Sequence, residues 1–273
     1  MSRSTENPLG KATAYPRGYS PQLLHAVPRS EARQSLRMGT SLPFHGEDLW
    51  NAWELSWLDV SGRPSAATAE IRVPAESPNI IESKSLKLYL NSLADSVYPA
   101  ADAVRLRIAA DLSACAGGEV SVQLGSVSDM GRYEIKALPG FCIDDADASF
   151  GLTSIDAGTL KSNRSELVSE ELHSHLLRSN CPVTGQPDTG SILIRYSGPK
   201  IQRGSLLGYL VAFREHEAFH EACVEKIFVD LKRRCAPSRL TVYARYNRRG
   251  GIDINPFRSD FEAQAENLRL PRQ

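Results

Sequence analysis

Alternating apolar and polar positions predict a pair of strands early in the chain. Trp53, Leu55 and Trp57 alternate with polar residues, a Gly-Pro turn follows at 61–64, and apolar positions alternate again over 67–73. Period-two alternation bounded by turn residues is typical of half-buried strands. These two runs therefore predict an antiparallel pair.

The pattern then changes from period two to helical spacing. Apolar residues between 86 and 97 recur every three or four positions, and Ser83 or Ser85 is available as an N-cap. A second run over 104–112 has the same spacing and is followed by Gly117-Gly118, a typical helix end. We predict two consecutive helices here.

Two further strands, over 120–124 and 133–137, are predicted in the first half, and a similar order of elements recurs in the second. There we predict strands over 192–196 and 207–211, a turn at 197–200, a helix whose apolar face spans 224–231, and a final strand over 240–246. Each half then reads strand–strand–helix–strand, with Glu82 or Glu221 at a strand-to-helix junction. This order indicates an internal duplication. The alternative is that the order is simply common, because many α+β domains share it.

Length and pattern together suggest how the chain is divided. At roughly 150 residues per domain, 273 residues correspond to about two domains. We expect an α+β fold with an extended N-terminal arm over 1–45, a first module over 46–145 and a second over 146–273. The polar, weakly patterned stretch 142–180 contains the predicted join.

Charge and hydropathy narrow the classes of function. The 32 basic residues balance 32 acidic residues, whereas a duplex nucleic-acid binder usually carries a basic surplus. No apolar run approaches the roughly 18 residues of a membrane helix, and the N-terminus lacks the apolar core of a secretory signal. We expect a cytoplasmic protein that binds neither membrane nor nucleic acid directly.

A cysteine in a rigid loop is the best candidate nucleophile. Cys181 lies in Asn-Cys-Pro-Val-Thr-Gly-Gln-Pro-Asp, whose prolines and glycine predict a turn-rich loop before a strand. Asp188, seven residues later, could fold back as its proton donor or base. The alternative is an ordinary loop cysteine beside a turn aspartate.

The segment 215–221 offers a competing chemistry, because it contains the pattern H-E-x-x-H. On a helix, His216 and His220 would share one face and bind zinc, with Glu217 as the base of a hydrolase. The pattern is short enough to arise by chance. An ordinary first helical turn with exposed histidines is the simpler interpretation.

Neither common nucleotide-binding fingerprint is present. There is no GxGxxG at a strand–helix turn and no GxxxxGK[ST]. Arg248-Arg249-Gly250-Gly251, after the last predicted strand, could bind phosphate through two guanidiniums and close backbone. A solvated turn would look the same.

Three separated segments together resemble one family. They are Glu82 to Tyr89 (ESKSLKLY), Asn180 to Asp188 (NCPVTGQPD), and Phe219 to Glu221 with Arg248 to Pro256. In this order they resemble the long form of the NADPH-dependent 7-cyano-7-deazaguanine reductases, the nitrile reductases of queuosine biosynthesis. The resemblance covers nearly all of 20–273 and implies two tandem tunnelling-fold modules, antiparallel sheets with helices packed on one face.

The resemblance also implies roles for individual residues. It implies that Cys181 forms a covalent thioimide with the nitrile carbon, that Asp188 is the proton donor, and that two NADPH molecules supply hydride. The implied substrate-binding residues are Ile81, Glu82, Ser83, His220 and Glu221, and the implied cofactor-binding residues are Ser83, Lys84, Arg249 and Gly250.

The resemblance further implies a free deazapurine base as substrate and a homodimer. The related GTP cyclohydrolases share the fold and use zinc, but their two cysteines and histidine are not recognisable here, so no metal is expected. The zinc hydrolase centred on His216, Glu217 and His220 is kept as the alternative enzyme. A non-catalytic base-binding module is the third possibility, and Cys181 with Asp188 weighs against it.

Overall fold

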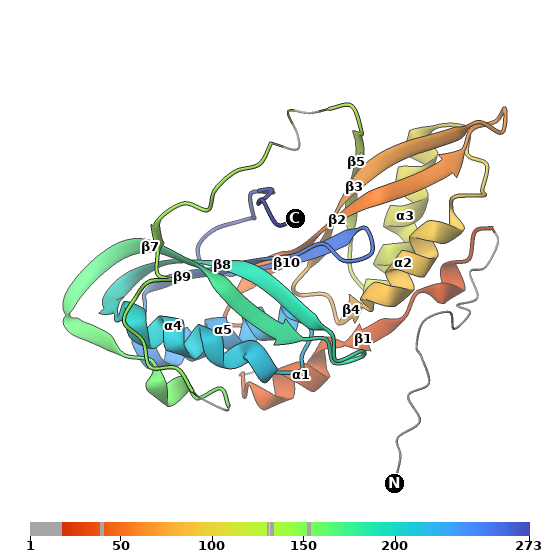
Figure 1. Ribbon diagram of the computed structural model, residues 1–273. Coiled ribbons are helices and arrows are strands. Elements are labelled where there is room, and N and C mark those ends of the chain that lie inside the picture. The colour runs from red at the N-terminus through yellow and green to blue at the C-terminus, as the bar shows by residue number, and fades with distance from the viewer. Residues whose placement is uncertain (1–17, 39–40, 130, 132–133, 152–153) are drawn as a thin grey trace, which may run out of the picture.

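Eight strands hydrogen-bond into one sheet, in the order β5-β3-β2-β10-β9-β8-β7-β6 (Figure 1). The computed structural model describes residues 18–38, 41–129, 131, 134–151 and 154–273. The strands are β2 (His45–Leu58), β3 (Pro64–Pro74), β5 (Ser121–Ser126), β6 (Phe141–Cys142), β7 (Ser162–Asn180), β8 (Pro187–Ile201), β9 (Arg239–Tyr246) and β10 (Ile252–Ser259). Only β6 and β7 pair in parallel; the other neighbours are antiparallel.

Helices and a small second sheet complete the described part of the chain. The helices are α1 (Arg29–Ser35), α2 (Ser83–Ser92), α3 (Ala101–Ala116), α4 (Arg203–Val211) and α5 (His220–Cys235), with 3₁₀ turns η1 (Pro21–Leu23), η3 (Ala157–Thr159) and η4 (Ala212–Glu215). The strands β1 (Ala26–Pro28) and β4 (Asn79–Ile81) form an antiparallel pair. None of the described helices is both long and apolar enough to cross a membrane.

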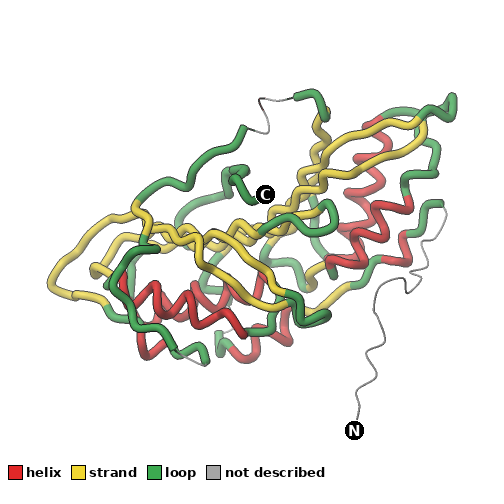
Figure 2. The backbone as a smooth tube through the Cα atoms, viewed as in Figure 1, coloured by secondary structure: helices red, strands yellow, loops and turns green. Residues whose placement is uncertain are grey.

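The helices cover one face of the large sheet. Leu193, Tyr243 and Phe257 lie next to one another on adjacent strands and pack under the C-terminal segment. Trp50 and Ile254, also a cross-strand pair, point to the opposite face and join the cluster that contains α2 and α3. Because side chains alternate along strands, the helices lie on one side and the C-terminal segment on the other (Figure 2).

Pairing of β10 with β2 joins the two halves of the chain. The ladder runs from Ile252 opposite Ala52 to Ser259 opposite His45, so a strand from the second half extends the sheet of the first.

The antiparallel sheet with helices on one face confirms the predicted α+β class. The boundaries of the two modules stay a prediction.

One strand and one turn predicted in the second half are wrong. Residues 207–211 belong to helix α4, and the turn predicted at 197–200 is part of β8. Every residue from Leu206 to Leu210 is buried, so this short helix has no polar face and its apolar run carries no helical period. A short apolar run does not distinguish a buried helix from a buried strand.

The long strand β7 was missed, and a strand at 133–137 does not form. Most of the first ten residues of β7 are exposed or half-buried, so this polar stretch shows no alternation; pairing with β8 makes it a strand. Residues 134–137 form only an isolated bridge between Ile135 and Arg269, and Tyr133 lies outside the described residues.

The expectation of an extended N-terminal arm is wrong for residues 18–38. They form η1, β1 and α1, and β1 pairs with β4. Arg29 Nη2 lies 2.5 Å from Asp48 Oδ2, and Arg33 Nη2 lies 2.7 Å from Glu225 Oε1. These partners are 19 and 192 positions away, so no local pattern could have indicated them.

Arg29 belongs to a buried ion network, and its removal is expected to cost stability. Arg258 bridges Asp48 and Glu225, each at 2.8 Å, and all four side chains are at most 3% exposed. Arg29→Ala leaves part of this charge uncompensated and should lower the free energy of unfolding by about 3 kcal/mol. Urea denaturation measures the loss.

The matched control is Arg105→Ala, which removes an exposed ion pair with Asp102. Such pairs contribute at most about 1 kcal/mol, so this variant should unfold almost like the wild type. Equal stability of the Arg29 and Arg105 variants would contradict the structural role given to the N-terminal segment.

Candidate active site

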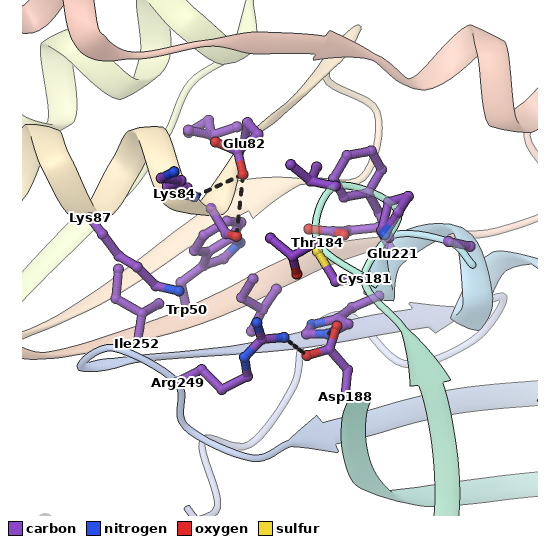
Figure 3. A pocket seen from close by; sticks show the side chains of 18 of the residues that line it. Trp50, Glu82, Lys84, Lys87, Cys181, Thr184, Asp188, Glu221, Arg249 and Ile252 are labelled. Carbon is purple, nitrogen blue, oxygen red and sulfur yellow. Dashed lines mark hydrogen bonds and ion pairs between the residues drawn. The ribbon is translucent and has the colours of Figure 1, made fainter. Parts of the chain in front are cut away.

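Five separate segments of the chain line one cavity of about 230 Å³ (Figure 3). They are strand β2, the start of α2, the β7–β8 loop, the start of α5, and the turn between β9 and β10 with the start of β10. The predicted site residues that line it are Ile81, Glu82, Ser83, Lys84, Cys181, Asp188, His220, Glu221 and Arg249. Gly250 lines an adjoining cavity of about 320 Å³, which shares Lys84 and Lys87 with the first.

Glu82 caps helix α2, a role that the sequence assigned to a serine. Its carboxylate accepts hydrogen bonds from the backbone N–H groups of Lys84 (2.8 Å) and Ser85 (2.7 Å). A capping carboxylate satisfies free N–H groups of the first turn and favours the helix dipole. The helix ends at Ser92, so the expected extension to Val97 is also wrong.

The two glutamates are not equivalent in the repeated order of elements. Glu82 immediately precedes α2, whereas Glu221 lies inside the first turn of α5, which follows α4. The predicted strand-to-helix junction before Glu221 was the segment that forms α4. The fold nevertheless brings both carboxylates to the same cavity.

A β-hairpin places Cys181 and Asp188 at the cavity. Asn180 pairs with Pro187 and Ser179 with Asp188, so 181–186 form the hairpin loop. The Cys181 N–H donates to Gln186 O (2.9 Å), and its carbonyl accepts from Gly185 N–H (2.8 Å). The hairpin register thus sets Asp188 opposite Ser179, two positions before Cys181. The action of Asp188 on Cys181 stays a prediction.

Asp188 is buried and held between His220 and Arg249. Its Oδ2 lies 3.1 Å from His220 Nε2, and its Oδ1 is paired with Arg249. Burial alone would raise the carboxyl pKa, but the hydrogen bond from His220 and the ion pair with Arg249 hold that pKa below its ordinary value. Asp188 is therefore a carboxylate when the site holds no substrate.

Two polar atoms of the cavity wall lack a hydrogen-bond partner among the described residues. They are His220 Nδ1 and Trp50 Nε1, both buried. The imidazole of His220 is fixed in place by two contacts. Its ring stacks on the Tyr246 ring with the ring centroids 3.7 Å apart, and its Nε2 lies against Asp188. Unsatisfied buried polar atoms are costly, which indicates that a ligand is their partner.

Glu221 is a fully buried carboxyl whose pKa is raised to about 8. Burial is the main cause and the negative charge of Asp48 adds to it; Arg29 and Arg258 act in the opposite direction but do not prevail. A group poised near neutral pH in a cavity is characteristic of a functional site.

Cations gather where the two cavities meet. Lys84 and Lys87 lie one turn apart on α2, and Arg249 faces them from the β9–β10 turn (Figure 3). Burial and the charge of Arg249 lower the pKa of Lys87. Gly250 has φ +57°, and a Cβ there would come within 3.2 Å of Lys87 Cδ. The turn thus needs glycine both for its backbone and for close contact with α2.

The H-E-x-x-H segment does not form a helical metal site. His216 ends η4 with extended backbone, and α5 begins only at His220. Residues 216–218 instead pair with Asn180 through bonds of 2.8 and 3.2 Å, and so fix the base of the Cys181 loop. The zinc hydrolase expected from this pattern is therefore not supported by the structure.

Sequence reasoning did not single out several residues that line the cavity, among them Trp50, Lys87 and Thr184. A signal existed for Lys87, because positions three apart on a helix share a face and Lys84 had been identified. Thr184 lies within the cysteine loop. Trp50 had no local signal, since its place depends on strand pairing across the sheet.

Comparisons with known proteins cover almost the whole chain. Residues 15–124 match the family described as nitrile reductase, 7-cyano-7-deazaguanine-reductase N-term, and residues 187–265 match the family described as QueF-like protein. A solved structure, the archaeosine synthase QueF-Like in the apo form, aligns with a TM-score of 0.31 and 17% identity, covering 38% of this chain and 99% of that one.

Curated relatives are much more similar. A protein of Burkholderia lata named NADPH-dependent 7-cyano-7-deazaguanine reductase is 51% identical over 269 residues, which is 98% of each chain. Its namesake from Burkholderia vietnamiensis is 50% identical over the same length. The chain therefore belongs to the family of NADPH-dependent 7-cyano-7-deazaguanine reductases.

Proposed function

We propose that this protein reduces the nitrile of 7-cyano-7-deazaguanine to the primary amine, 7-aminomethyl-7-deazaguanine, with two NADPH, in queuosine biosynthesis. The observation that carries the proposal is the single cavity lined by Cys181, Asp188, Glu82 and Glu221. It combines a nucleophile, a proton-transfer group and two carboxylates suited to the N–H edge of a guanine-type base.

Base recognition follows from the polar groups of the cavity wall. A carboxylate accepts the paired N–H donors of a guanine-type edge, and leaving such donors unpaired would cost about 1–3 kcal/mol. Glu82 uses each oxygen once for capping, which leaves further lone pairs for ligand. Trp50 Nε1 offers a donor, and His220 Nδ1 offers an acceptor when its Nε2–H donates to Asp188.

The first chemical step uses Cys181 and Asp188. Cys181 Sγ attacks the nitrile carbon while Asp188, already a carboxylate, takes the thiol proton. The same proton then passes from Asp188 to the nitrile nitrogen, whose electron pair comes from the C≡N bond. The product is a neutral thioimide on Cys181, so atoms and charge balance without a metal ion.

Cofactor binding fits the adjoining cavity. NADPH, when bound, supplies hydride for each of the two reductions. Lys84, Lys87 and Arg249 gather positive charge beside the first turns of α2, which suits the phosphates of such a cofactor. Ser83 is the first residue of α2 and lines the first cavity beside these cations. Arg249 would also orient Asp188, with which it is paired.

Gly250→Ala is expected to raise the KM for NADPH by about tenfold, with little change in the affinity for the nitrile substrate. The added methyl group would press on Lys87 and strain a left-handed residue. Steady-state kinetics with each substrate varied separately measures the effect. Gly62→Ala is the control, because Gly62 has φ +82° in an open turn with no atom within 4 Å of the Cβ position. Equal NADPH KM values for both variants would refute the cofactor role.

NADPH absorbance decay tests the function directly. Purified, chelator-treated protein should consume two NADPH for each 7-cyano-7-deazaguanine added. No oxidation under these conditions, with hydrolytic activity appearing when zinc is restored, would instead favour the zinc hydrolase. Normal substrate binding without any NADPH oxidation would point to the non-catalytic base-binding module.

The finer expectations about partners and location belong to the same proposal. We expect a free deazapurine rather than RNA as substrate, a homodimer in solution, and a cytoplasmic location. The formal net charge of zero supports a free deazapurine rather than RNA as substrate. The five free cysteines support a cytoplasmic location. Light scattering of the purified protein tests the dimer.

A further inference from the structure

A second cluster of reactive side chains lies at the β6 edge of the sheet, away from the cavity. Cys142 Sγ and one ring nitrogen each of His173 and His175 lie within 4.8 Å of one another. Within the described ranges, this is the only such group of three or more His, Cys, Asp or Glu side chains. None of the three lines the active-site cavity.

Strand geometry produces the cluster. β5 and β6 lie at opposite edges of the sheet (Figure 1), and at the β6 edge Cys142 pairs in parallel with His173. His173 and His175 are two positions apart on β7, which places their side chains on one face. Their rings lie 5.2 Å apart, edge to face.

Outer contacts fix how the histidines are oriented. His173 Nδ1 lies 2.8 Å from the Pro139 carbonyl, which only accepts, so Nδ1 carries the proton and Nε2 keeps its lone pair. His175 Nδ1 lies 2.8 Å from Ser191 Oγ, which leaves its Nε2 for a ligand. Metal-binding histidines are typically held in this way by a carbonyl or hydroxyl.

The charged neighbours are compatible with a bound cation. Asp144 accepts from Ser174 Oγ (2.6 Å) and from the His175 N–H (3.1 Å), and so adds negative charge and locks β6 to β7. Arg272 brings a positive charge near the cluster, which disfavours a cation. Its guanidinium, however, donates hydrogen bonds to the His175 carbonyl (2.9 Å) and to Ser191 Oγ (3.0 Å).

We propose that Cys142, His173 and His175 bind one Zn²⁺ ion, with solvent as the fourth ligand. Two imidazoles and a thiolate are ligands that zinc prefers. Bond lengths of about 2.0–2.3 Å at the tetrahedral angle require ligand atoms about 3.3–3.6 Å apart, so the three side chains move closer together around the ion. The ion would fasten β6, only two residues long, to the edge of the sheet.

Cobalt titration of chelator-treated protein tests the site, because Co²⁺ bound to a thiolate gives a sulfur-to-metal charge-transfer band. We expect one equivalent to bind with this band, and Zn²⁺ to displace it. Cys142→Ser removes a ligand, so it should abolish the band and weaken Zn²⁺ binding by at least roughly 100-fold. Ser191→Ala removes only the hydrogen-bond partner of His175, so it should weaken Zn²⁺ binding by roughly tenfold.

Two controls separate this site from the catalytic one. Cys181→Ser should lose nitrile reduction but keep the cobalt band, whereas Cys142→Ser should keep nitrile reduction and thus show that it folds. Saturating Zn²⁺ should raise the melting temperature of the wild type by roughly 5 °C and leave that of Cys142→Ser unchanged. A wild-type protein without the band, or an unchanged band in Cys142→Ser, would overturn the proposal.

Discussion

Cys181→Ala should reduce nitrile reduction at least 10⁴-fold, to the level of the uncatalysed background. The alanine variant should still bind the substrate, because the carboxylates and the cavity wall remain. In the wild type without NADPH, intact-protein mass spectrometry should show the mass of one substrate molecule added, since thioimide formation releases no leaving group. The variant should show no added mass.

Cys115→Ala is the matched control for this prediction. Cys115 is a partly buried free thiol near the end of α3 that does not line the cavity. Its removal should leave both turnover and the covalent adduct intact. Normal turnover by Cys181→Ala, or an adduct that persists in it, would eliminate the thioimide mechanism.

Glu221→Gln should weaken substrate binding by at least roughly 100-fold and, in the same variant, make the free protein more stable. The carboxylate that binds the base is replaced by an amide, which presents an N–H group to N–H donors. At the same time a buried ionisable group is removed. Calorimetry measures the first effect and thermal unfolding without ligand the second.

The gain in stability should depend on pH in a defined direction. The pKa of Glu221 is about 8 in the folded protein, against an ordinary value of 4.5. Below 4.5 both states are protonated and wild type and variant should differ little. Between 4.5 and 8 only the unfolded state loses its proton, so wild-type stability falls as pH rises. The amide does not titrate, and the advantage of Glu221→Gln should reach about 3–5 kcal/mol near pH 8.

Substrate binding by the wild type should also release a proton near pH 7. Pairing with N–H donors favours the carboxylate of Glu221, which is largely protonated in the free protein. Calorimetric titration in buffers of different ionisation enthalpy measures this release. Glu217→Gln, a change at an exposed neighbour, should release the same proton and bind normally. Identical affinity and proton release in the wild type and Glu221→Gln would refute the role of Glu221.

Local pattern was sufficient where apolar and polar residues alternate with the period of the element. The β2–β3 pair, helix α3 with its end at Gly117, the α5 helix and β9 all show a clear period in the sequence. Pattern failed where no such alternation exists. Residues 206–210 of α4 are all buried, and the first half of β7 is mostly polar on both faces.

The residue types and their order along the chain determined the chemistry and the family. Three features could be identified without a structure. They are a cysteine with an aspartate seven residues later, the segment from Glu82 to Tyr89, and the Arg-Gly turn. Glu82 as the cap of α2 could not be identified, because Ser83 or Ser85 would have served the same local purpose.

Tertiary structure alone decided how these groups act on one another. Pairing of β10 with β2 brings the Arg249 turn beside α2, and the β7–β8 hairpin carries Cys181 to the same cavity. Whether Asp188 is ionised and Glu221 protonated depends on burial and on charges contributed from distant segments, such as Arg249 and Asp48. The sequence contains those residues, but a pKa depends on distances that only the folded chain sets.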